Sequence, residues 1–256
     1  AMQAGVAIQN GRVYLNSGSH LCSCKIEGLP SQKTEDIGWT YLRSNWTDQA
    51  TFLAMQTSSS PMGRSHYDQN NFVVNVAGNW IITDSEYRDL KYEHSDTATK
   101  TINHNTILVD GIGQDKVAGG KREEFFQSPY YSYALGDATN SYPSDKMSKF
   151  LRHIIYLRPN YFLIFDQLES PNPAKFTWLL HTDSLGRMNL KNNFISIKKK
   201  KAELNSFILK PDKFEVKINE GEYGPYASVS NLENKKEMNF LSFICSKIPE
   251  DAFTEE

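Results

Sequence analysis

The chain has few cysteines, little net charge and no long apolar run. Three cysteines among 256 residues are too few for the paired framework that holds small disulfide-rich domains together. The formal net charge of −2 neither favours nor excludes a polyanionic ligand. No apolar stretch is long enough to cross a bilayer. The first residues also lack the basic and apolar regions of a signal peptide, and we expect the chain to be a piece of a longer protein.

Helical patterning is also scarce. No amphipathic segment longer than about three turns follows the i, i+3, i+4 spacing, and no repeat of 20–50 residues is visible. Instead, short runs of Val, Ile, Thr and aromatic residues alternate with turn residues, and the aromatic fraction is 12%. Such runs are typical of strands in a sandwich or barrel. We therefore predict an all-β fold, a large two-sheet antiparallel β-sandwich of the supersandwich type with few helices.

Turn residues place the expected strands. The Asn10-Gly11 pair predicts a hairpin at 6–15, because this pair fits the tight turn that joins two twisted strands. A second hairpin is expected at 72–83. Further strands are expected at 39–44, 50–56, 106–109, 150–157, 161–165, 176–181, 194–198, 204–209, 214–218 and 238–244.

Three regions follow from this pattern. Residues 1–35 are expected to form lead-in strands, and residues 36–185 the sandwich core with the candidate site. Residues 186–256 are expected to complete the sandwich or to form a small second β-layer. Residues 87–100 are polar and lack alternation, which predicts a long loop of the kind that often carries function.

Four consecutive lysines at 198–201 have two interpretations. They could form a patch that binds a polyanion. They could also occupy a solvated turn between two strands, where lysine discourages edge-to-edge pairing. We favour the turn, because one short charge run is weakly diagnostic.

Polar residues at three strand boundaries form the candidate site. His66 precedes the run at 72–76, Asp84 ends the run at 80–83, and His104 opens the run at 106–109. Taken singly, each has a simpler interpretation as a loop, turn or cap residue. Taken together, two imidazoles and one carboxylate suit a zinc ion. The trio therefore predicts a metal site where strand ends meet.

The order of these motifs resembles the C-terminal β-sandwich of the heparinase II/III family of polysaccharide lyases. The resemblance covers residues 36–182 and rests on motifs at 38–44, 63–72, 80–87, 104–111, 137–142, 152–166 and 178–181. It implies a zinc ion held by His66, Asp84 and His104 in a structural role. It also implies a parent protein with an N-terminal helical toroid, which this chain does not show.

The resemblance further implies an activity for the parent protein, the cleavage of a uronic-acid-containing polysaccharide by β-elimination. This reaction needs a base for the C5 proton, a group that neutralises the carboxylate and an acid for the leaving oxygen. In the family the toroid supplies the base and the carboxylate-neutralising groups, so we expect this chain alone to be inactive. The implied partners are the toroid and an acidic polysaccharide or oligosaccharide, such as a glycosaminoglycan or alginate. The implied location is periplasmic or secreted, with no nucleic-acid partner and no membrane span.

Three residues carry the expected contact with substrate. Many relatives present a His-x-His-x-Asp loop, and here Arg64 takes the first position. Arginine stays charged and cannot act as a general base, but its fork can grip a carboxylate or sulfate. Tyr87 is expected to donate a proton or to stack on a sugar, and Asn105 to contact substrate. Arg64 also supports an alternative function, a non-catalytic carbohydrate-binding or structural sandwich domain.

Neighbouring residues are expected to support the site and the core. Asp68 and Asn70 are expected to brace the His66 loop by hydrogen bonds. Trp178 and His181 lie three positions apart on one expected strand, so their side chains point to opposite faces. Trp178 is the expected core residue of the two.

Overall fold

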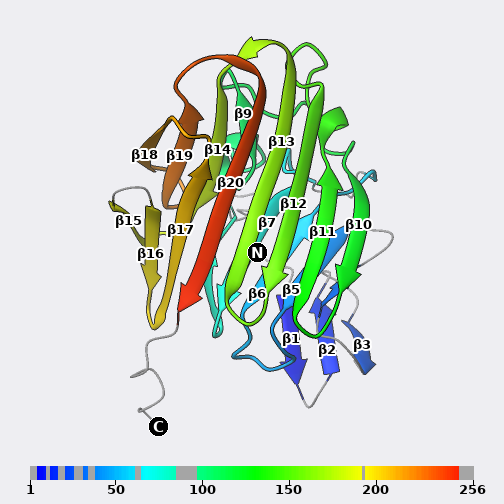
Figure 1. Cartoon of the computed structure of the whole chain (residues 1–256). Coiled ribbons are helices and arrows are strands. Elements are labelled where there is room, and N and C mark those ends of the chain that lie inside the picture. Colours follow the sequence, from blue (N-terminus) through cyan, green and yellow to red (C-terminus); the bar gives the residue numbers. More distant parts are fainter. Residues whose placement is uncertain are drawn as a thin grey trace.

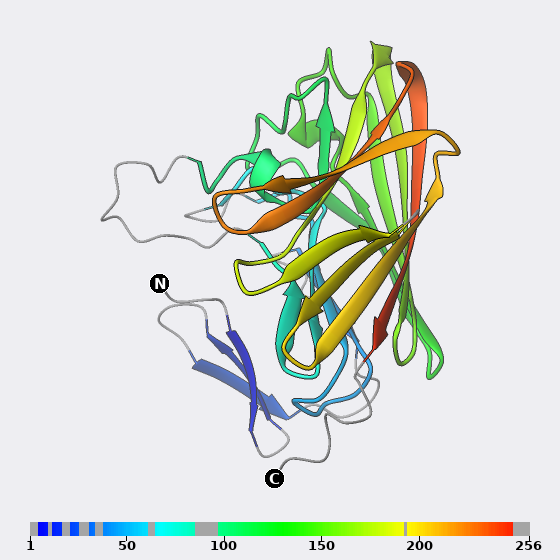
Figure 2. The same cartoon turned by 90° about the vertical axis from the view of Figure 1, so that its left-hand side faces the viewer.

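Two layers of antiparallel sheet make up the sandwich. The computed structural model describes residues 5–9, 12–16, 21–25, 31–33, 38–60, 65–84, 97–191 and 194–247. An eight-stranded sheet forms one layer and faces the viewer in Figure 1. A four-stranded and a five-stranded sheet lie beside one face of it, as the edge-on view in Figure 2 shows. The predicted all-β antiparallel sandwich is confirmed.

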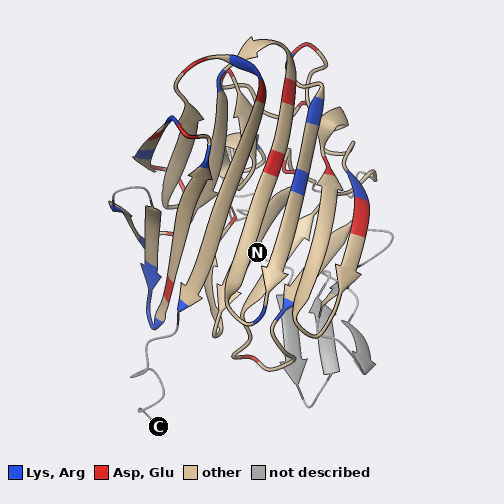
Figure 3. Ribbon diagram, in the orientation of Figure 1, with Lys and Arg blue, Asp and Glu red and all other residues tan. Residues whose placement is uncertain are grey.

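The eight-stranded sheet combines strands from the middle and the end of the chain. In spatial order its strands are β10 (Lys121–Gln127), β11 (Tyr131–Asp137), β12 (Lys149–Leu157), β13 (Tyr161–Ala174), β20 (Lys235–Lys247), β17 (Ala202–Lys210), β16 (Phe194–Lys199) and β15 (Arg187–Lys191). Buried and half-buried residues alternate along β12, because successive side chains point to opposite faces. Figure 3 shows charged residues scattered over this sheet and not gathered into one patch.

The second layer carries the strand ends that matter for the site. Its four-stranded sheet has the order β18 (Phe214–Glu220), β19 (Pro225–Asn231), β14 (Phe176–His181) and β9 (Ile107–Val109). Its five-stranded sheet has the order β4 (Gln32–Lys33), β5 (Trp39–Arg43), β6 (Phe52–Gln56), β7 (Asn71–Val76) and β8 (Asn79–Ile82). Strands from residues 186–247 therefore enter both layers.

A separate three-stranded sheet contains β1 (Gly5–Gln9), β2 (Arg12–Asn16) and β3 (Leu21–Lys25). Gln9 pairs with Arg12 across the first two strands, so the hairpin predicted at 6–15 is confirmed. Its Asn10-Gly11 turn lies outside the described residues. The described helical segments are two 3-10 turns, η1 (Thr101–Asn103) and η2 (Thr139–Ser141). No helix in the described part of the chain is long and apolar enough to cross a membrane.

The main core fills the space between the two layers. Phe72 of β7 packs on Trp178 of β14, with ring centroids 6.3 Å apart. Phe150 and Ile154 reach the same cluster from β12, and all four side chains are almost fully buried. Burial of such large apolar side chains contributes roughly 1.5–3 kcal/mol each. Trp178 is therefore a core residue, as predicted.

The sequence pattern missed several strands, and one reason is visible in β10. This edge strand reads Lys-Arg-Glu-Glu-Phe-Phe-Gln, and a bulge between Arg122 and Glu124 breaks its alternation. Charged edge strands limit aggregation but give no clear period in the sequence. The lysine run does form the β16–β17 turn, with Lys199 pointing inward. Its Nζ atom contacts Asp183 and donates to the Trp80 carbonyl at 2.9 Å.

Candidate metal centre

The candidate centre lies where strand ends from both smaller sheets meet. His66 and Asp68 precede β7, and Asp84 follows β8. Because β7 and β8 are antiparallel neighbours, the start of one lies beside the end of the other. His104 precedes β9, whose antiparallel partner β14 ends at His181. The topology thus brings segments that are distant in sequence to one place.

Backbone hydrogen bonds join the two smaller sheets at this place. The Thr83 amide donates to the His181 carbonyl at 3.2 Å. The Tyr67 amide donates to the Thr99 carbonyl at 2.9 Å, and the Thr101 hydroxyl donates back to the Tyr67 carbonyl at 2.8 Å. The loop that carries His66 is therefore fixed against the segment that leads to His104.

Three side chains form a group that could bind a metal ion. His66, Asp68 and His104 each offer one ligand atom, and these atoms lie within 4.8 Å of one another. The two imidazole rings have centroids 5.2 Å apart. His104 is fully buried, Asp68 is 5% exposed and His66 is half-buried. The group therefore lies below the surface of the protein and is largely shielded from solvent.

Two buried atoms of this group are suited to bind a cation. Nε2 of His104 and Oδ1 of Asp68 are buried and have no hydrogen-bond partner among the described residues. An unpaired buried polar group costs roughly 1–3 kcal/mol. A bound cation would satisfy both atoms, and neutral imidazole with carboxylate is a usual donor set for zinc.

Asp84 contacts the opposite side of the His104 ring. Its Oδ1 atom contacts Nδ1 of His104, and its Oδ2 atom accepts a hydrogen bond from Asn71 Nδ2 at 2.7 Å. A carboxylate on the second ring nitrogen commonly orients a metal-binding histidine. The trio named from sequence and the trio that the geometry groups share both histidines and differ in the carboxylate. Asp68, expected only to brace the loop, has a more central position.

The charges in this cluster perturb one another. Burial raises the pKa of Asp68 to about 6, and the nearby Asp84 carboxylate adds to this rise, while His104 opposes it. Burial lowers the pKa of His66, and the neighbouring His104 lowers it further, while Asp84 opposes the shift. Burial alone would also lower the pKa of His104, but the charge and hydrogen bond of Asp84 outweigh it, so this pKa is raised. A metal ion would compete with the protons that these groups hold.

Asn105 is a structural residue and not a surface contact. Its side chain is fully buried. Its Nδ2 atom donates to the carbonyls of Phe72 at 2.8 Å and Thr83 at 2.7 Å, and its Oδ1 atom accepts from the His181 amide at 2.6 Å. The substrate contact expected at Asn105 stays a prediction, and these protein contacts do not support it, because they occupy the polar atoms of the side chain. Asn105 joins β7, the residue that follows β8, and the end of β14.

His181 is buried beside the centre, whereas its strand position predicted only that it faces away from Trp178. Its Nε2 atom lies 3.0 Å from the Ile102 carbonyl, and its ring stacks on Tyr226 with centroids 5.0 Å apart. Burial lowers its pKa to about 4, with His104 adding to the shift, so the ring is neutral at physiological pH. It lines a small hollow together with Asp84, Thr182 and Tyr223. The sequence signals for His181 are its place at the end of an apolar strand and within the motif at 178–181.

Asn70 has the bracing role that the sequence predicts for it. Its backbone lies in the left-handed region with φ of 61°, which asparagine tolerates better than most residues. Its side chain accepts from the Thr57 hydroxyl at 2.8 Å and donates to the Gly136 carbonyl at 3.1 Å. Arg64 and Tyr87 lie outside the described residues.

Comparisons with known proteins agree with the fold. A family model described as "Heparinase II/III-like, C-terminal" matches residues 27–238. The chain belongs to this family. No curated protein sequence matches the chain.

Solved structures of heparinase III proteins share the fold of this family member. A heparan sulfate lyase from Pedobacter heparinus superposes with a TM-score of 0.75 at 16% identity over 88% of this chain. A heparinase III gene product gives a TM-score of 0.75 at 14% identity over 86%. A further heparinase III structure gives 0.70 at 13% identity over 91%. This chain spans only 37%, 36% and 39% of those longer chains, respectively.

Proposed function

We propose that this chain is the metal-bearing sandwich part of a polysaccharide lyase that cleaves a uronic-acid-containing polymer by β-elimination. Family membership and the heparin-lyase names of the similar structures support this proposal. The single observation that carries it is the group of His66, Asp68 and His104, because these three side chains could hold a metal ion and lie in motifs that resemble those of the family. A helical toroid elsewhere in the parent protein would supply the base.

The metal in this proposal is zinc with a structural role. His66 and His104 would hold the ion, and Asp68 would be the third ligand. Asp84 would orient the imidazole ring of His104 through its contact with Nδ1. The family resemblance implies a second arrangement, in which His66, Asp84 and His104 would be the ligands. When bound, the ion would supply a fixed positive charge that ties the loops together. In either arrangement the protein residues bind, orient and exclude water, and they do not remove the substrate proton.

Substrate recognition is proposed for two residues of the loops around the centre. Arg64 would grip a carboxylate or sulfate of the sugar through its planar fork, and Tyr87 would donate a proton or stack on a ring. Both positions flank described parts of the centre, namely His66 and Asp84. The substrate class is an acidic polysaccharide, with glycosaminoglycan and alginate both included. A periplasmic or extracellular location fits such a substrate.

A second candidate function is a non-catalytic carbohydrate-binding or structural sandwich domain. The presence of Arg64 where many relatives have a histidine favours it, because arginine cannot serve as a general base. Under this alternative the domain binds acidic glycans, and the parent protein produces no unsaturated uronate.

One experiment separates the two functions. The parent protein, this chain and an Arg64→Ala variant of each are incubated with heparan sulfate and alginate, and unsaturated product is followed by ultraviolet absorbance. We expect product from the parent, none from the isolated chain, and weaker substrate binding after Arg64→Ala. Glycan binding without product from the parent would support the alternative. Turnover by the isolated chain would contradict our assignment of the base to the toroid.

A further inference from the structure

A buried ion pair lies beneath the candidate centre, in the sequence motif at 152–166 that the proposed function leaves unexplained. Arg152 of β12 and Asp166 of β13 face each other in register, and both side chains have no solvent exposure. Arg152 Nε donates to Asp166 Oδ1 at 2.7 Å, and Nη2 donates to Oδ2 at 2.7 Å. This is the two-pronged geometry that arginine forms best with a carboxylate.

The remaining nitrogen of Arg152 reaches across to the other layer. Nη1 donates to the carbonyl of Asn70 at 2.6 Å and to the carbonyl of Asn105 at 2.7 Å. Asn70 is two residues after Asp68, and Asn105 directly follows His104. Nη1 of Arg152, a residue of the eight-stranded sheet, therefore binds both loops that carry the candidate ligands.

The surroundings keep this guanidinium in one place. Phe72 and Phe150 flank it, with the guanidinium carbon 5.3 Å and 5.4 Å from their ring centroids. Asp166 uses both carboxylate oxygens on Arg152. Four directed donor contacts from one planar group leave little freedom in the relative position of the two loops. Lysine could not reproduce them, since its ammonium is a point charge without a fork.

We infer that Arg152, held by Asp166, is a positioning residue that sets the distance between the Asp68 and His104 loops and so tunes metal affinity. The inference rests on the proposed metal centre. It differs from a general stabilising role in one respect: loss of the fork should disturb the two loops more than the rest of the sandwich. Groups that orient metal ligands typically alter metal affinity 10–100-fold when they are changed.

The test compares Arg152→Lys with wild type and with a control variant, Leu204→Ala. Leu204 is fully buried in β17 of the same sheet and pairs with Ile197 and Ser246, so its truncation leaves a cavity at a position outside both loops. Zinc affinity is measured by chelator competition, and Co²⁺ absorption reports the ligand geometry. Amide hydrogen exchange of residues 65–71 and 101–106 is followed in the metal-free proteins. Asp166→Asn serves as a milder variant that keeps the side-chain volume.

We expect Arg152→Lys to weaken zinc binding 10–100-fold, to change the Co²⁺ spectrum and to speed exchange in the two loops. Leu204→Ala should lower stability but keep wild-type affinity and loop protection. Equal zinc affinity and loop exchange in Arg152→Lys and wild type would overturn the inference, as would equal losses in both variants. If wild type binds no zinc, the metal proposal fails. The loop exchange of Arg152→Lys or Asp166→Asn, relative to Leu204→Ala, still decides the positioning role.

Discussion

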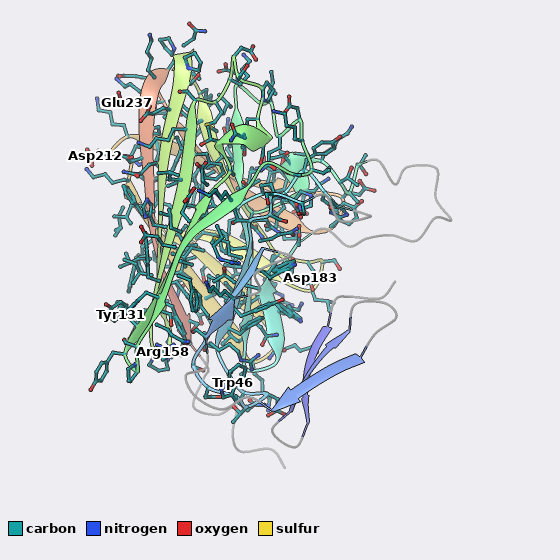
Figure 4. The ribbon with its side chains drawn as sticks, turned by 90° about the vertical axis from the view of Figure 1, so that its right-hand side faces the viewer. Trp46, Tyr131, Arg158, Asp183, Asp212 and Glu237 are labelled. Atoms are coloured by element: carbon teal, nitrogen blue, oxygen red, sulfur yellow. The ribbon has the colours of Figure 1, made fainter. Side chains whose placement is uncertain are left out.

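Arg152 and Lys199 both reach from the eight-stranded sheet to the smaller layer, and they do so in different ways. Arg152 lies beneath the candidate centre, is fully buried and makes four hydrogen bonds. Lys199 lies at the turn end of β16, with 9% of its side chain exposed, and contacts Asp183 and the Trp80 carbonyl. Figure 4 labels Asp183 on the side of the molecule away from Asp212 and Glu237.

The difference shows that a cation joining two layers can stabilise the fold alone or can also fix the position of a binding site. Lys199 joins the layers through a compact charge near water, where a modest change in position is tolerated. Arg152 joins them through a rigid fork in a dry environment, where its contacts fix the backbone of two loops. We therefore expect both residues to matter for stability and only Arg152 to matter for the metal.

The largest effect is expected for Arg152→Met. This change leaves the Asp166 carboxylate buried without its partner, which typically lowers the free energy of unfolding by about 3–5 kcal/mol. Urea unfolding followed by circular dichroism measures it. The double variant Arg152→Met, Asp166→Leu should regain much of that loss, because it removes the unpaired charge. A loss below about 1 kcal/mol in the single variant would refute the importance of the pair, since exposed pairs contribute that little.

A smaller loss of stability is expected for Lys199→Met. The change removes a charged hydrogen bond and leaves Asp183 partly exposed to water, so the free energy of unfolding should fall by about 1.5–3 kcal/mol. The zinc affinity of the folded protein should stay at the wild-type value. A tenfold weaker affinity in Lys199→Met would remove the contrast between the two cations.

Changes to the two carboxylates around His104 are expected to affect metal affinity more than folding stability. Asp84→Asn should weaken zinc binding about 10–100-fold, as expected for a group that orients a metal-binding histidine. Asp68→Asn should weaken it further, because it removes a proposed ligand. Isothermal titration of zinc into the metal-free variants gives both values. The reverse order would assign Asp84 as the ligand and place the ion at Nδ1.

Most of the fold could be predicted from the sequence, because alternation and turn residues are local signals. The run at 150–157 alternates clearly and forms β12. The charged edge strand β10 has no regular alternation of apolar and polar residues. Its place in the fold depends on its pairing with β11. The missed elements are those whose burial is decided by neighbours and not by their own pattern.

The candidate site could be predicted only in outline. His66, Asp84 and His104 stood out as polar residues at strand boundaries, and the structure brings them together. The roles of Asp68, His181 and Asn105 depend on which atoms face inward, which a sequence pattern does not contain. The contacts of Arg152 with Asn70 and Asn105 depend on how the two layers stack. The positions of these residues in the sequence do not indicate these contacts.

The proposed metal ion between His66 and His104 can be tested by zinc titration of the metal-free chain beside its His104→Ala variant. We expect one zinc ion per wild-type chain and none in the variant at the same concentrations. At a zinc concentration of 100 Kd the wild-type chain should gain about 2.7 kcal/mol of stability, which a chelator removes, while the variant should respond to neither. A wild-type chain that binds no zinc, or a variant that binds it equally well, would rule out a zinc site that depends on His104.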